Sequence, residues 1–140
     1  IMDRVNTKDM IQRRKWKIND GPECVLCHTG ALEDRNHLFF QLNFSMRVWN
    51  YLQISWLNSQ DMVQIAHHAR KDFNKPFFSE VFVLTWWNIW KVSNDKVFRY
   101  LRPTFRQWRN GFVQDISLLA HRIKSRHRDA LIRWIDFLPP

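Results

Sequence analysis

The sequence predicts a mostly α-helical protein, with a small Cys/His loop of the zinc-knuckle kind near the N-terminus and a bundle of about four to five helices after it. Two observations support this class. Apolar residues recur at steps of three and four through most of the chain, as on one face of a helix. Cys24 and Cys27 stand two residues apart, with His37 following them. With three glycines in 140 residues, a β-sandwich or a glycine-rich phosphate loop is not expected.

The chain is long enough for one domain, or for a small module joined to a helical subdomain. We predict a zinc-binding-like module with flanking helices at 1–57, a linker with a short helix at 58–78, and a helical subdomain with a basic C-terminal face at 79–140. No apolar run reaches membrane-spanning length, and no secretory signal is visible at the start of the chain. We therefore expect an intracellular protein, nuclear or cytoplasmic, that does not bind a membrane.

Each helix is expected where periodic apolar residues follow a capping residue or a breaker. Thr7, Ser59, Ser79 and Thr104 are the predicted starting points of four of them. Residues 38–40 are the one candidate for a short extended segment. The helix that begins at Ser79 is apolar nearly all round, which predicts a central position in the fold. The predicted helices span 8–16, 45–57, 60–71, 79–98, 104–123 and 130–138.

Cys24, Cys27 and His37 have the residue types and order of a structural zinc site. A Cys-x-x-Cys turn points both sulfur atoms to one side, and the later imidazole closes the loop onto the metal. His28 is the best candidate for the fourth ligand by type, and Glu33 or Asp34 could substitute. Two alternatives stay open: reduced thiols beside a hydrogen-bonded His37, and the Cys-x-x-Cys-His signature of covalent haem attachment, in which His28 would be the axial ligand.

Positive charge is concentrated in the last third of the chain. The formal net charge of the protein is +9. Residues 99–133 hold nine Lys or Arg against two acids, a net charge of +7. On a helix, the densest part would form a solvent-facing ridge that contacts phosphates without reading sequence. The predicted contacts are Arg122, Lys124, Arg126 and Arg128. The alternative is an ordinary solvated helix face.

Other functional patterns are weak or missing. Trp86, Trp87 and Trp90 could form a base-stacking platform, but their helical spacing within an apolar segment favours core packing. The sequence has no nucleophile elbow, no Walker-type loop and no acidic cluster suited to two magnesium ions. We therefore expect a protein that is not an enzyme and takes no small-molecule substrate.

Several motifs together resemble the reverse-transcriptase zinc-binding domain of plant LINE-type (non-LTR) retrotransposons. The family places a cysteine five residues after its histidine, and Leu42 stands at that position here. A looser similarity continues at Trp87, Trp90, Lys91, Asn94 and Phe98, with Ser93 in place of an arginine. The stronger matches are Asn6 to Ile11, Arg13 to Trp16, Cys24 to Cys27, His37 to Phe40, Phe44-Ser45 and Val48-Trp49.

The resemblance implies zinc as the cofactor, with Cys24, Cys27 and His37 as ligands. It also implies a module at the C-terminal end of a polyprotein that helps to hold RNA or DNA. Because leucine cannot coordinate a metal, we predict that the site is degenerate. The predicted function is that of a non-catalytic, retroelement-derived module that binds nucleic acid through a basic helical face. The alternative is a structural or protein-interaction relic that binds neither nucleic acid nor metal.

Overall fold

The computed structural model describes residues 7, 21, 23, 24, 26, 27, 29–57 and 61–140. This part of the chain is helical, as predicted, and the helix expected at 8–16 lies outside it. None of the described helices is long and apolar enough to cross a membrane. The elements, in order, are the π-helix η2 (His37–Gln41) and the α-helices α2 (Asn43–Tyr51), α3 (Met62–Phe73), α4 (Phe78–Arg99), α5 (Phe105–Ala120) and α6 (Ser125–Asp136).

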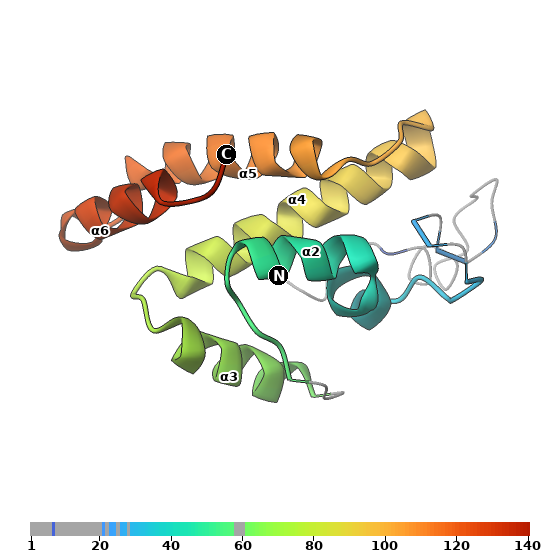
Figure 1. The fold of residues 1–140 in the computed structure, drawn as a ribbon, viewed down its shortest axis with the longest axis horizontal. Helices are drawn as coiled ribbons and strands as arrows, with labels where there is room; N and C mark the ends of the chain where they lie inside the picture. The colour runs from blue at the N-terminus through green and yellow to red at the C-terminus, as the bar shows by residue number, and fades with distance from the viewer. Residues whose placement is uncertain (1–6, 8–20, 22, 25, 28, 58–60) are drawn as a thin grey trace.

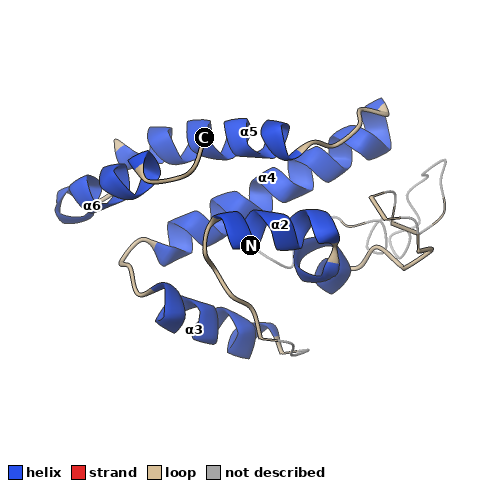
Figure 2. Ribbon diagram, in the orientation of Figure 1, coloured by secondary structure: helices blue, strands red, loops and turns tan. Residues whose placement is uncertain are grey.

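Helix α4 is the centre of the fold, as its apolar sequence predicts. It lies between α5 and α2, with α3 beside its N-terminal half (Figures 1 and 2). The Phe39 ring of η2 stacks on Trp86 with a centroid distance of 4.2 Å, and Trp49 of α2 lies 5.9 Å from Phe82. Rings from the predicted zinc-binding-like module therefore pack directly on the first helix of the predicted C-terminal subdomain.

Side-chain caps begin two of the described α-helices, α3 and α5, whereas α4 starts without one at Phe78, a residue before the predicted start at Ser79. Thr104 begins α5 with a capping box, in which its hydroxyl accepts from Gln107 N and Gln107 Oε1 accepts from Thr104 N. Helix α3 starts at Met62 and is capped by Asp61, whose carboxylate accepts hydrogen bonds from the backbone amides of Val63 and Gln64. Ser59, the predicted cap, lies outside the described residues, and α3 has its cap at Asp61.

Two helices end earlier than predicted. Helix α2 ends at Tyr51 instead of residue 57, because Gln53 adopts a left-handed conformation with φ 56°. The Gln53 and Ile54 amides then donate to the carbonyls of Asn50 and Trp49, which is the hydrogen-bond pattern of a Schellman motif. Helix α5 ends at Ala120 and the chain turns over residues 121–124, so the basic segment predicted to lie on one helix is divided between a turn and α6.

Residues 38–40 are π-helical, so this candidate for a short extended segment is helical instead. In a π-turn a carbonyl does not accept a hydrogen bond from the backbone amide four residues later, as it would in an α-helix. Helix α2 supplies side-chain donors to two carbonyls of η2. The Ser45 hydroxyl donates to the carbonyl of Leu38, and Trp49 Nε1 donates to that of Phe39 at 2.7 Å. All four residues are buried. These two hydrogen bonds hold η2 and α2 together as one unit.

Gly111 marks the close approach of α5 to α4. A Cβ atom at this position would lie 2.5 Å from Asn88 Oδ1. Asn88 cannot move away freely, because its Nδ2 donates to the Leu84 carbonyl and to Asp115 Oδ2, both at 2.9 Å. The absence of a side chain at residue 111 is therefore a packing requirement.

We expect Gly111→Ala to destabilise the protein by about 1–3 kcal/mol, the usual cost of overpacking a close contact. Helix propensity alone would stabilise this variant by about 1 kcal/mol, so the sign of the change tests the contact. Urea unfolding of Gly111→Ala, Asn88→Ala and the double variant measures the coupling. A stabilised Gly111→Ala protein would show that the helices do not approach as closely as described.

Candidate metal centre and nucleic-acid interface

The structure brings the three predicted metal ligands together. One ligand atom from each of Cys24, Cys27 and His37 lies within 4.8 Å of the other two. Cys27 Sγ and His37 Nε2 are 3.3 Å apart. In tetrahedral zinc sites the ligand atoms lie about 3.5–3.8 Å from one another, as the bond lengths to sulfur and nitrogen require. Two sulfur atoms and one imidazole nitrogen therefore have the chemistry and approximate spacing of three vertices of a zinc site.

Local backbone structure explains this convergence. An antiparallel bridge joins Glu23 to Leu32, and the Cys24 amide donates to the Ala31 carbonyl at 2.8 Å. The loop after Cys27 is thereby folded back on the cysteine turn. The backbone at His37 is fixed by Asp34, whose Oδ1 accepts a hydrogen bond from the His37 amide at 2.7 Å, as an N-cap residue does.

The two thiols have opposite electrostatic environments. Burial raises the pKa of the Cys24 thiol to about 12, although the Leu26 amide, 3.4 Å from its sulfur, acts in the other direction. The hydrogen bond from the Thr29 hydroxyl lowers the pKa of Cys27 to about 6, with a smaller contribution from His37. Cys27 is thus a thiolate at neutral pH, whereas Cys24 keeps its proton until a bound cation compensates the charge.

The fourth ligand position of the resembled family contains a core side chain. Leu42 is 3% exposed and its amide donates to the His37 carbonyl at 2.9 Å, so it follows the histidine by one helical turn. His28 lies outside the described residues. Asp34 already caps the backbone at His37. Glu33, which is 2% exposed, raises the pKa of Cys24 through its charge and therefore lies near that thiol.

The donor set fits zinc at three positions. Cys24, Cys27 and His37 would hold the ion, and the described residues form no larger group of metal ligands around them. Bound there, zinc would supply a structural cross-link between the cysteine turn and the start of η2. Such a link would connect the N-terminal loop to the aromatic core.

The four predicted phosphate contacts divide into two kinds. Arg122, Lys124 and Arg126 are exposed around the turn from α5 into α6; Arg126 Nε donates to His127 Nε2 at 3.0 Å. Arg128 instead donates to the carbonyls of Ala120 at 3.0 Å and His121 at 3.3 Å. Its guanidinium satisfies the C-terminal carbonyls of α5 and complements the helix dipole, so its first role is structural.

One tryptophan of the predicted core faces solvent. Trp86 is 4% exposed and belongs to the core as expected, but Trp87 is 46% exposed. Trp87 stacks on Trp90 with a centroid distance of 5.0 Å, and Lys91 Nζ lies 5.9 Å from its ring centroid. The core prediction is therefore wrong for Trp87. Periodicity could not separate these neighbours, because every face of α4 carries apolar residues.

Comparison with known proteins gives one family match. Residues 1–49 match the family model described as zinc-binding in reverse transcriptase. Neither the curated proteins nor the solved structures that we searched contain a match to the chain. The matched segment includes all three clustered ligands and ends at Trp49, the residue that donates to the π-helix. The N-terminal part of the chain, residues 1–49, is thus similar to the zinc-binding segment of reverse transcriptases.

Proposed function

We propose that the protein is a non-catalytic, retroelement-derived module that binds RNA or DNA independently of sequence. The observation that carries the proposal is the exposed basic cluster of Arg122, Lys124 and Arg126 at the turn between α5 and α6. These cations can neutralise phosphates and release counterions, which is the main source of non-specific affinity. The family match supports a nucleic-acid context, because reverse transcriptases act on nucleic acids.

In this function the zinc site has a structural role. Three candidate ligands among the described residues predict weak metal binding, and we expect the aromatic core around α4 to hold the fold when the metal is absent. The basic cluster lies on α6 and its preceding turn, while the cysteine turn packs near η2 at the other end of the described structure (Figure 1). Nucleic-acid binding is therefore expected to persist when zinc is removed by a chelator.

A triple variant, Arg122→Gln, Lys124→Gln and Arg126→Gln, is expected to bind a single-stranded oligonucleotide more weakly and with less salt dependence. Losing three phosphate contacts reduces the slope of log affinity against log salt by about 2 for single strands. Fluorescence anisotropy over a salt series measures both quantities.

Arg128→Gln is the matched control for this experiment. It removes one positive charge but also the cap of α5, so we expect a loss of about 0.5–2 kcal/mol in unfolding free energy with little change in the salt slope. An unchanged slope in the triple variant, or binding that is insensitive to salt in the parent, would contradict the proposed function.

A further inference from the structure

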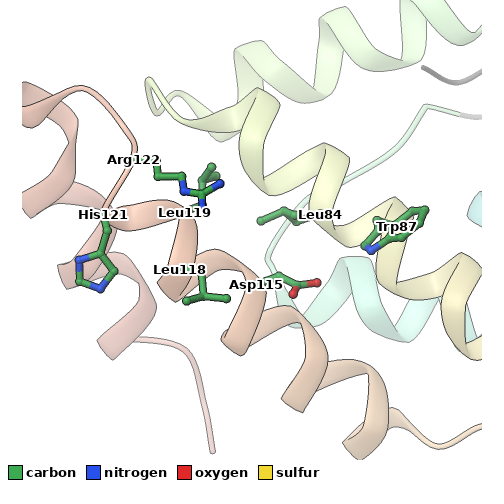
Figure 3. Close-up of a pocket in the computed structure, with 7 residues that line it drawn as sticks. All are labelled: Leu84, Trp87, Asp115, Leu118, Leu119, His121 and Arg122. Carbon is green, nitrogen blue, oxygen red and sulfur yellow. The ribbon is translucent and has the colours of Figure 1, made fainter.

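A groove between α4 and α5 joins an exposed tryptophan to the basic cluster. Its volume is about 500 Å³, and Leu84, Leu118 and Leu119 form most of its apolar lining. Trp87 and Arg122 also line it, and Figure 3 shows them at opposite ends, with Leu84 between them. The groove is thus apolar along its length, aromatic at one end and cationic at the other.

Asp115 is the acid among the described residues that line the groove, and its negative charge is compensated, so it would not repel a bound anion. Asp115 Oδ2 accepts from Lys91 Nζ at 3.1 Å and from Asn88 Nδ2 at 2.9 Å. The Lys91 ammonium compensates the carboxylate charge. The positive charge of Arg122 therefore gives the groove a net positive charge. The His121 imidazole also lines the groove, at the same end as Arg122 (Figure 3).

We propose that this groove takes an unpaired nucleobase of a single strand, with Trp87 as the stacking partner and Arg122 on the adjacent phosphate. A flat ring, an apolar floor and a guanidinium are the groups that bind single strands without reading sequence. The groove volume of about 500 Å³ lies within the range of small-ligand pockets, about 300–1,000 Å³, so the groove has room for a base. This inference rests on the proposed function and adds a preference for single strands over duplex, whose bases are already stacked.

The test compares two single strands of about 12 nucleotides, an oligothymidylate and an abasic strand with the same number of phosphates. Trp87→Leu, which keeps apolar bulk but no ring, is expected to weaken binding of the oligothymidylate by about 5- to 150-fold, the range found when a stacking side chain is removed. Binding of the abasic strand is expected to stay the same. Trp87→Phe is expected to restore most of the affinity for the oligothymidylate.

Phe137→Leu is the control, since Phe137 is 86% exposed and lies outside the groove, so its loss should change neither affinity. Equal effects of Trp87→Leu on both strands, or no effect on either, would overturn the groove as a base site while leaving the phosphate contacts intact. Failure of the parent to bind either strand would overturn the proposed function itself. A parent dimer that dissociates in Trp87→Leu, measured by sedimentation, would also overturn the inference and would assign the groove to a second copy of the chain.

Discussion

A Leu42→Cys variant is expected to bind close to one equivalent of zinc, whereas the parent protein binds it weakly or substoichiometrically. The substitution places a third thiolate one helical turn after His37, at the position where the resembled family has its last ligand. A complete structural site contributes about 10–16 kcal/mol to folding, and three ligands leave one coordination position to water. Metal analysis after gel filtration measures the stoichiometry. Thermal unfolding with and without a chelator measures the stabilisation, at about 3–4 °C per kcal/mol for a chain of this size.

Leu42→Ser is the matched control, because serine has nearly the shape of cysteine and does not provide a thiolate. Both variants shorten a side chain that is 3% exposed, so both should lose stability when a chelator is present. Only Leu42→Cys should regain it with zinc. A full equivalent of zinc in the parent would contradict the degenerate site and would indicate that another residue, such as His28 or Glu33, completes the coordination.

Trp49→Ala is expected to destabilise the protein by about 3–5 kcal/mol, as removal of a large buried aromatic side chain usually does. That is a large part of the total stability of a domain, about 5–15 kcal/mol. Trp49 is 1% exposed and its ring contacts Trp56 at a centroid distance of 4.6 Å and Phe82 at 5.9 Å. The substitution would therefore open a cavity between α2 and α4. Urea unfolding followed by circular dichroism measures the change.

Two further variants separate the causes. Trp49→Phe keeps an aromatic ring but removes the donor to the Phe39 carbonyl, so we expect a loss of about 1–3 kcal/mol from that buried acceptor. Trp87→Ala, at a tryptophan that is 46% exposed, should cost less than about 1 kcal/mol. If Trp49→Ala were as mild as Trp87→Ala, the aromatic contacts between the family-matched segment and α4 would not support the fold.

Where a helix ends depends on the residue that stops it, and here two stops carry no sequence signal. Gln53 and Tyr100 adopt left-handed conformations just after the ends of α2 and α4, whereas Asn74 after α3 is a residue type that often does so. Glycine usually has this role, and its absence at residue 53 led to a predicted end of α2 that lies six residues too far along the chain. By contrast, Pro103 and Thr104 are local signals, and the start of α5 was predicted correctly from them.

The candidate metal centre likewise combines features that the sequence predicts with features that only the folded structure decides. The identity and order of Cys24, Cys27 and His37 were sufficient to predict a cluster, because a short loop brings such ligands together. The ionisation of the two thiols was not predictable, since it depends on burial at Cys24 and on the hydroxyl of Thr29 beside Cys27. The basic cluster was predicted as one helical ridge, but the turn after Ala120 gives Arg128 a structural role.

The sequence by itself determined the helical class, the central position of α4 and the clustering of Cys24, Cys27 and His37, because periodicity and residue spacing are local properties. Only the tertiary structure decided which residues of an apolar helix face solvent. Trp86 and Trp87 are neighbours of the same type, yet the packing of η2 covers one and the groove beside α5 exposes the other. Which tryptophan is buried depends on the helices that pack against α4, and the sequence of α4 alone does not predict it.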